Sequence, residues 1–176
     1  MINRKFIPVN IAVLTVSDTR THENDRSGDV LAKYINDSGH FLKNREILKD
    51  DRTIISSKLT EWCKRDDIDV VITTGGTGLT GRDVSVEAHR DIYEKEIDAF
   101  ATMFTIISMK KIGTSAVQSR ACAGVAFGTY LFALPGSPGA CKDGWEEILK
   151  YQLDYTHKPC NFVEIMPRLD EDKKRK

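Results

Sequence analysis

The stretch Val70-Val71-Ile72-Thr73-Thr74-Gly75-Gly76-Thr77-Gly78 decides how this chain folds. Its first four residues form an apolar, β-branched run, which is typical of a strand covered on both faces. The run leads directly into a loop of small residues, Thr74–Gly78. Ligands of open α/β sheets bind at the carboxyl ends of such strands, and glycine N–H groups can point at phosphate oxygens. We predict a ligand-binding loop here, with a flexible turn as the alternative.

The loop matches neither of the common nucleotide-binding patterns. No Gly-Lys-Ser/Thr follows it, as a Walker A motif requires, and the G-x-G-x-x-G spacing is absent. P-loop hydrolysis and hydride transfer on a dinucleotide therefore lose support. Thr74 and Thr77 add hydroxyl donors to the glycine N–H groups, so phosphate binding by other means stays open.

The residues before this loop predict alternating strands and helices. Residues 11–16 (IAVLTV) form a second buried-type strand, and residues 41–48 form a weaker strand pattern. Two helical patterns separate the strands, and Asp51 is a plausible N-cap for the second. They are marked by Val30, Leu31, Tyr34 and Ile35, and by Ile55, Leu59 and Trp62. This order predicts an α/β protein with a parallel sheet and helices on both faces.

The residues after the loop add a hairpin to that sheet. A helix is expected from Ile97 to about Lys111, closed by Gly113. The strands Cys122–Phe127 and Thr129–Leu134 are joined only through Gly128, so they must be antiparallel. The sheet is therefore mixed. A sharp turn at residues 134–138 opens a last helix, with Ser137 as N-cap and Pro138 at its first position.

Composition narrows the class of protein. Lys+Arg and Asp+Glu are both 26, so the formal net charge is zero, which argues against nucleic-acid and membrane-surface binders. The 176 residues predict one domain, with residues 168–176 a frayed charged tail. We find no transmembrane run and no signal peptide, and expect a cytoplasmic protein whose four cysteines are buried free thiols.

Several polar residues lie where the predicted strands end. Asp83 follows the glycine loop and either binds Mg²⁺ or caps a helix. Asp50 reaches the same crevice if its strand and residues 70–73 are neighbours, and is otherwise in a solvated turn. The remaining candidates are Ser17, Asp18, Ser119, Arg120 and the corner Pro135, Gly136 and Ser137. Arg120 is either a phosphate clamp or half of a surface ion pair, and the four histidines are expected to be structural or exposed.

Taken together, these segments resemble a known family. The matching blocks are Thr74–Gly78, Arg82–Ala88, Ser119–Arg120 and Leu134–Pro138, and the likeness extends from about residue 7 to about residue 163. The chain resembles the molybdenum cofactor biosynthesis protein B and molybdopterin adenylyltransferase family. The resemblance implies a three-layer α/β/α sandwich with a mostly parallel mixed sheet, and a single molybdopterin-binding domain over residues 1–176.

The resemblance also implies a reaction and the residues that perform it. Mg²⁺-dependent adenylylation of molybdopterin by ATP would give adenylyl-molybdopterin and pyrophosphate, in trimers or hexamers. Asp50 and Asp83 match the family's two carboxylates, which are associated with activity, with Mg²⁺ and with positioning. The substrate-binding positions would be Ser17, Asp18, Thr74, Gly75, Gly76, Thr77, Gly78, Ser119, Arg120, Pro135, Gly136 and Ser137.

Three other functions are compatible with parts of this pattern. A protein that only binds or carries molybdopterin would need the same loops without catalysis. Molybdate insertion occurs in related proteins with extra domains, for which 176 residues leave no room. An unrelated nucleotide-binding α/β protein would bind ATP without any effect of molybdopterin. The sequence keeps both carboxylates, which favours the adenylylating enzyme.

Overall fold

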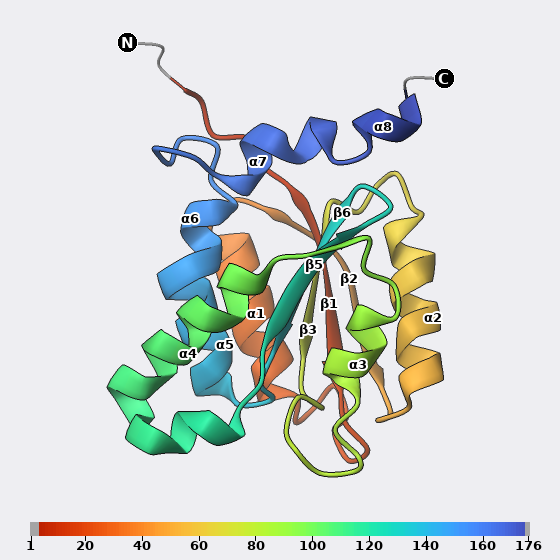
Figure 1. The fold of residues 1–176 in the computed structure, drawn as a ribbon, viewed down its shortest axis with the longest axis vertical. Helices are drawn as coiled ribbons and strands as arrows, with labels where there is room; N and C mark the ends of the chain where they lie inside the picture. The colour runs from red at the N-terminus through yellow and green to blue at the C-terminus, as the bar shows by residue number, and fades with distance from the viewer. Residues whose placement is uncertain (1–3, 175–176) are drawn as a thin grey trace.

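The computed structural model describes residues 4–174 and contains one six-stranded mixed sheet (Figure 1). The strand order is β2-β1-β3-β6-β5-β4. The pairs β1/β2, β1/β3 and β3/β6 are parallel, whereas β5 is antiparallel to both β4 and β6. The strands are β1 (Asn10–Val16), β2 (Phe41–Leu48), β3 (Val70–Thr74), β4 (Lys95–Glu96), β5 (Cys122–Ala126) and β6 (Thr129–Leu134).

Helices cover both faces of the sheet, so the predicted three-layer α/β/α sandwich is confirmed (Figure 1). One face is covered by α1 (Arg26–Asp37), α4 (Asp98–Ile112), α5 (Pro138–Gly144) and α6 (Lys150–Gln152), and a π-helical turn over Trp145–Leu149 joins the last two. The other face is covered by α2 (Arg52–Cys63) and α3 (Ser85–Arg90).

The continuous apolar run in β1 explains its central place. Successive side chains of a strand point to opposite faces. Ile11 and Val13 therefore pack into the core under α1, α4 and α5, while Ala12 and Leu14 pack against α2. Residues 11–14 and Val16 are apolar, as expected of a strand with both faces buried, and the buried Thr15 hydroxyl is hydrogen-bonded to Asp25.

The predicted helix ends are confirmed at three positions. The Asp51 side chain accepts a hydrogen bond from the Ile54 N–H at 2.9 Å and caps α2. Ser137 does the same for α5, accepting from the Ala140 N–H at 3.1 Å. Gly113 follows α4 with φ +58°, a conformation that favours glycine.

The carboxyl-terminal segment is described through residue 174 and contains short helical turns, whereas the sequence predicted a frayed tail over residues 168–176. After α7 (Phe162–Ile165) and a 3₁₀ turn (Met166–Arg168), α8 runs over Glu171–Lys174, and residues 175–176 lie outside the described residues. Leu169 packs against the core, and Lys173 pairs with Glu94. The packing of Leu169 and the ion pair of Lys173 thus hold this segment against the rest of the protein, although its composition predicts a solvated tail.

The prediction of four buried free cysteines is confirmed for three of them. The four cysteines are free, and Cys63, Cys122 and Cys141 are buried as expected. Cys160 is exposed, which corrects that expectation, because it follows the exposed pair Lys158 and Pro159 in a surface loop. Within residues 4–174, no helix is long and apolar enough to cross a membrane.

Candidate functional site

A cleft of about 570 Å³ lies at the carboxyl ends of β1, β3 and β6, at the lower end of the sheet in Figure 1. Strands that run in parallel place their following loops at the same edge of a sheet, which is why segments far apart in sequence meet here. Most of the predicted site residues line the cleft. They are Ser17, Asp50, Thr74, Gly75, Gly76, Thr77, Gly78, Asp83, Ser119, Pro135, Gly136 and Ser137.

The glycine loop is held in one conformation by the loops beside it. Gly75 and Gly76 have φ values of +97° and +64°, which disfavour any side chain. A Cβ on Gly75 would lie 2.3 Å from the Val16 carbonyl oxygen, and one on Gly136 would lie 3.0 Å from the Gly75 Cα. The Gly75 N–H also donates to the Leu134 carbonyl at 3.0 Å. The segment therefore packs closely against the ends of β1 and β6 and forms part of the cleft wall.

The two threonines of the loop were expected to donate hydrogen bonds to a ligand. Thr74 instead donates within the protein, and Thr77 is buried. The Thr74 hydroxyl donates to the Pro135 carbonyl at 3.0 Å and contacts the Cys141 sulfur at 3.1 Å. It therefore joins the glycine loop to the corner that follows β6. Thr77 lines the cleft but is 3 % exposed. In this loop, backbone N–H groups are the better candidates for ligand contact.

Asp50 reaches the cleft although its strand does not neighbour β3. The sequence predicted this contact on the condition that the two strands are neighbours, but β1 lies between β2 and β3. Asp50 follows β2 and places its Oδ1 2.8 Å from where a Cβ on Gly76 would be, so only glycine fits beneath it. Burial raises the pKa of Asp50, and the nearby negative charge of Asp18 raises it further.

Asp83 holds a turn and does not cap a helix. Its Oδ2 accepts hydrogen bonds from the Thr80 hydroxyl at 2.6 Å and the Thr80 N–H at 2.9 Å. Helix α3 begins two residues later, after Val84, with no side-chain cap. The Thr80 hydroxyl and N–H bonds lower the pKa of Asp83 below its usual range. The pKa values of these two carboxyl groups, which line the same cleft, are therefore shifted in opposite directions.

Two predicted contacts lie outside the set of cleft-lining residues. Asp18 is exposed and forms an ion pair with Arg82, whose Nε is 3.0 Å from Asp18 Oδ2. Arg120 donates from its Nε to the Thr77 and Gly78 carbonyls, at 3.0 Å each, and its guanidinium pairs with Glu87. Arg120 therefore supports the glycine loop, and its place differs from that of the phosphate clamp considered for it.

The structure adds cleft residues that the sequence argument did not select. They are Thr15, Val16, Thr19, Arg20, Asp25, Ser27, Arg82 and Gln118. Several belong to the polar stretch between β1 and α1, in which only Ser17 and Asp18 were selected. The available signal was the length of this polar stretch, because a loop that long at the end of a central strand must cover part of the ligand edge.

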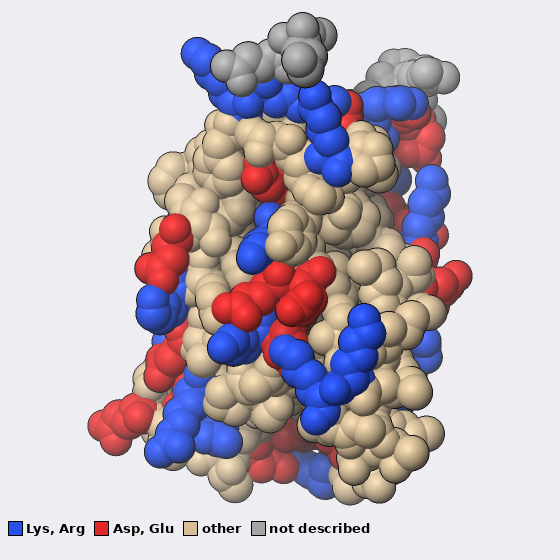
Figure 2. Space-filling view, turned by 90° about the vertical axis from the view of Figure 1, so that its left-hand side faces the viewer, with Lys and Arg blue, Asp and Glu red and all other residues tan. Residues whose placement is uncertain are grey.

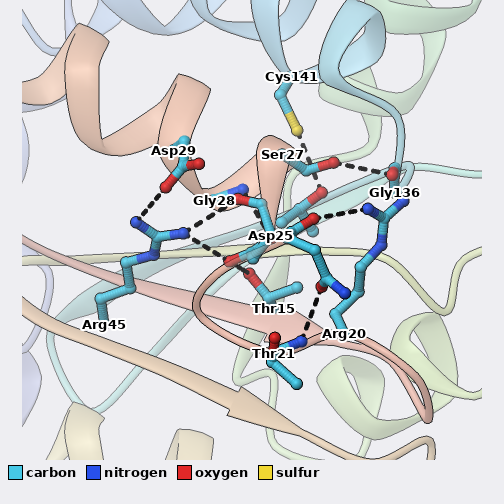
Figure 3. Close-up of polar contacts among 12 residues, drawn as sticks. Thr15, Arg20, Thr21, Asp25, Ser27, Gly28, Asp29, Arg45, Gly136 and Cys141 are labelled. Atoms are coloured by element: carbon cyan, nitrogen blue, oxygen red, sulfur yellow. Dashed lines mark hydrogen bonds and ion pairs between the residues drawn. The ribbon is translucent and has the colours of Figure 1, made fainter.

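Asp25 organises this stretch from a buried position (Figure 3). It caps α1 by accepting from the Gly28 N–H at 3.0 Å, and it accepts from the Thr15 hydroxyl and the Arg45 guanidinium at 2.8 Å each. Burial opposes its charge, but the Arg45, Gly28 and Thr15 hydrogen bonds outweigh burial and lower the pKa of Asp25. Ser27 donates to the Gly136 carbonyl at 2.8 Å and joins α1 to the second corner.

The architecture of the cleft defines the class of protein. Three parallel strands end at one cleft, whose walls combine a glycine loop, a second small-residue corner and two carboxylates. A cleft at the carboxyl edge of a parallel sheet is where α/β proteins bind small ligands. The family model described as "Probable molybdopterin binding domain" matches residues 12–155, which include this cleft.

The chain belongs to the family of molybdenum cofactor biosynthesis protein B and has a role in molybdenum cofactor biosynthesis. The protein of that name from Escherichia coli (strain K12) is 44% identical over 161 residues, covering 92% of this chain and 95% of its own. The one from Bacillus anthracis is 39% identical, covering 84% of this chain and 88% of its own.

Solved structures agree with the sequence relatives. A crystal structure of molybdenum cofactor biosynthesis protein B superposes with a TM-score of 0.86 at 34% identity, covering 96% of this chain and 99% of that one. The tungsten cofactor synthesizing protein MoaB from Pyrococcus furiosus superposes with a TM-score of 0.72 at 33% identity, covering 81% and 91%. The α/β sandwich is therefore a shared fold.

Proposed function

We propose that this protein adenylylates molybdopterin with Mg-ATP, giving adenylyl-molybdopterin and pyrophosphate. The main support is the placement of two carboxylates directly against the glycine loop. Asp50 Oδ1 lies 2.8 Å from the Cβ position of Gly76, and Asp83 Oδ2 lies 2.7 Å from that of Gly78. A loop that only bound phosphate would be weakened by two adjacent carboxylates, because they repel the ligand. Their presence favours a site that also accepts a cation with the phosphates.

The residues fit Mg²⁺ that arrives with a nucleotide. Mg²⁺ prefers oxygen ligands and is often held by one or two carboxylates together with substrate phosphates. Within residues 4–174 no group of three or more His, Cys, Asp or Glu side chains forms a metal cage. Asp50 and Asp83 would therefore share the ion with the phosphates of ATP. When bound, Mg²⁺ offsets negative charge on the phosphates and orients the leaving pyrophosphate.

The chemistry requires no covalent protein intermediate. An oxygen of the terminal phosphate of molybdopterin attacks the α-phosphorus of ATP, and the bond from that phosphorus to the bridging oxygen of the β-phosphate breaks. The electron pair of that bond leaves with pyrophosphate. The glycine loop and the Pro135–Ser137 corner position the two reactants, and positioning supplies much of the rate in phosphoryl transfer.

The test is an adenylylation assay with purified chain, molybdopterin and α-labelled ATP. Asp83→Asn and Asp50→Asn are each expected to lower turnover by about 100-fold or more. Asp37→Asn is the matched control, because Asp37 pairs with Lys33 on the exposed end of α1. Turnover unchanged in both cleft variants would remove the carboxylates from the chemistry.

A second function uses the same cleft without catalysis. A molybdopterin-binding or carrier protein would bind molybdopterin and release no pyrophosphate from ATP. The low pKa of Asp83 and the raised pKa of Asp50 favour the enzyme, because unequal carboxylates are common at catalytic sites. Molybdopterin binding by wild-type protein with no pyrophosphate formed over hours would support the carrier instead.

We also propose that the chain self-associates as a trimer or hexamer in the cytoplasm. Figure 2 shows the face that carries α1, α4 and α5, on which charged side chains are separated by uncharged areas. The side chains of Met103, Ile106, Met109 and Ile112 on α4 are 47–56 % exposed. Apolar exposure of this extent on one helix is typical of a surface that a second copy covers.

A further inference from the structure

The arginines around the cleft differ in whether a carboxylate already neutralises them. Arg45 pairs with Asp25 and Asp29, Arg82 with Asp18, and Arg120 with Glu87. Arg20 lines the cleft and, among residues 4–174, forms no ion pair with a carboxylate. Arg20 is therefore the cleft cation whose charge is available to a ligand.

The backbone around Arg20 fixes where its guanidinium lies. Ser17 Oγ accepts hydrogen bonds from the N–H groups of Thr19 and Arg20, at 3.2 Å each. The Asn24 carbonyl accepts from Arg20 Nη1 at 2.7 Å, and Asn24 Oδ1 accepts from the Thr21 N–H at 2.8 Å. These bonds fold the loop back on itself. Arg20 and Gly136 both line this cleft, and Figure 3 shows both around the Asp25 network.

The cleft therefore offers a phosphate two electrostatically different kinds of neighbour, carboxylates and a guanidinium. Carboxylate oxygens of Asp50 and Asp83 lie close to the glycine loop. A phosphate bound at this loop would therefore need a metal ion to offset their negative charge. Arg20 lies on the β1–α1 loop in the same cleft, and a guanidinium can bind a phosphate without a metal ion. A guanidinium has five N–H donors, and the bond to Asn24 uses one of its nitrogens.

We propose that Arg20 is the centre of a metal-independent subsite for a phosphate monoester, and that this subsite holds the terminal phosphate of molybdopterin. The identity of the substrate rests on the proposed function. The subsite assigns Arg20 to the phosphorylated pterin and the two carboxylates to the metal-bound nucleotide. In this assignment the Arg20 guanidinium neutralises the phosphate of the pterin, and Asp50 and Asp83 bind the metal ion of the nucleotide. The two reactants then meet in the space between these groups.

The first test uses inorganic phosphate as the probe. Its binding is measured by ³¹P NMR titration in the presence of EDTA, which removes metal ions. Wild-type protein should bind phosphate without a metal, and Arg20→Ala should weaken binding by about tenfold or more. Arg26→Ala is the charge-matched control, because Arg26 is exposed at the start of α1 and does not line the cleft. Phosphate binding that is absent in wild-type protein, or equal in Arg20→Ala, would overturn the proposal.

A second control separates the cleft from the hollow on the other side of the loop. Arg20 also lines that hollow, of about 320 Å³, together with His22 and Lys49. Lys49→Ala should leave phosphate affinity unchanged if the phosphate lies in the cleft. A loss in Lys49→Ala as large as that in Arg20→Ala would place the phosphate in the hollow and would contradict the assignment.

The last test distinguishes this subsite from the proposed reaction. In the adenylylation assay, Arg20→Ala should raise the KM for molybdopterin about tenfold or more and leave the KM for Mg-ATP near its wild-type value. A rise in the KM for Mg-ATP alone would overturn the assignment. Arg20-dependent phosphate binding in a wild-type protein that forms no pyrophosphate would keep the subsite and reject the adenylylation.

Discussion

At the scale of single residues, the two cleft carboxylates differ in how they affect stability. The pKa of Asp50 is raised by burial, so the folded state holds its proton more tightly than the unfolded chain does. The free energy of unfolding therefore falls as pH rises through the pKa of Asp50. The pKa of Asp83 is lowered by the Thr80 hydrogen bonds. The ionised Asp83 side chain therefore stabilises the folded state at pH values above its pKa in the unfolded chain. This stabilisation is lost as the pH falls through its lower pKa in the folded state.

We therefore predict stability changes of opposite sign at pH 7. Asp50→Asn removes a half-buried charge and should raise the free energy of unfolding by about 0.5–1 kcal/mol. Asp83→Asn removes a charge-assisted hydrogen bond and should lower it by about 1 kcal/mol. Both effects should shrink toward about pH 4, where ordinary carboxyl groups begin to protonate. Urea unfolding across this range measures both, and changes of the same sign would contradict the interpretation.

Two of the predicted site residues have protein partners that the sequence could not show. Arg120 bonds the Thr77 and Gly78 carbonyls, 43 and 42 residues away, and the Thr74 hydroxyl bonds Pro135, 61 residues away. Residue type shows that a guanidinium or hydroxyl can donate a hydrogen bond. It does not show whether a carbonyl from a distant loop will accept that bond before a ligand does. Only the tertiary structure decides this.

At the scale of elements, Arg120 joins three segments that follow one another along the ligand edge. It lies just before β5 and bonds the glycine loop, the Asp83 carbonyl at 3.3 Å, and Glu87 on α3. Helix α3 has six residues and no side-chain N-cap, so its own hydrogen bonds fix it only weakly. We infer that this guanidinium holds the loop that carries Asp83 in register with the rest of the cleft.

Arg120→Ala should therefore loosen residues 77–83 before it affects the rest of the sheet. We predict a loss of about 1–3 kcal/mol in the free energy of unfolding and faster amide hydrogen exchange in this loop. Hydrogen-exchange mass spectrometry measures the local effect. Arg90→Ala is the control, because Arg90 is exposed and pairs with Glu96. Exchange that rises equally in all segments would reject a local role for Arg120.

The elements themselves divide into those with a strong local signal and those without one. Residues 70–74 and 10–16 were predictable as central strands because both faces of each are apolar. The two-residue strand β4 and the π-helical turn at Trp145–Leu149 leave no periodic pattern to detect. The ordering of residues 168–174 depends on contacts with Glu94 and the core, which lie far away in the chain.

At the scale of the whole molecule, zero net charge is compatible with an anionic ligand because the charges are arranged locally. Acidic and basic residues are equal in number, so no long-range field attracts phosphates. The cleft nevertheless holds Arg20 together with Asp50 and Asp83. The sequence predicted the fold and most of the cleft, because both follow from strand order. It could not predict which cleft arginines pair with carboxylates, because that depends on the tertiary structure.

The surface of α4 gives a prediction about assembly. Phe100 and Phe104 bury one side of this helix against the sheet, and Met103, Ile106, Met109 and Ile112 remain exposed on the other sides. A helix that is apolar all round is normally buried on all sides. Light scattering coupled to size-exclusion chromatography should therefore give three or six times the 19.8 kDa chain mass. Ile106→Glu should reduce that mass toward a single chain, because it buries an unpaired charge at the interface.

The control for this prediction is a second exposed apolar residue on the opposite layer of the sandwich. Ile54 on α2 is 49% exposed, the same as Ile106. Ile54→Glu therefore makes the same chemical change at similar exposure, and should leave the mass unchanged. If both variants dissociate the assembly, general loss of stability is the cause; if Ile54→Glu alone does so, the interface lies on α2. A wild-type mass of one chain would leave α4 without a covering copy and would contradict self-association.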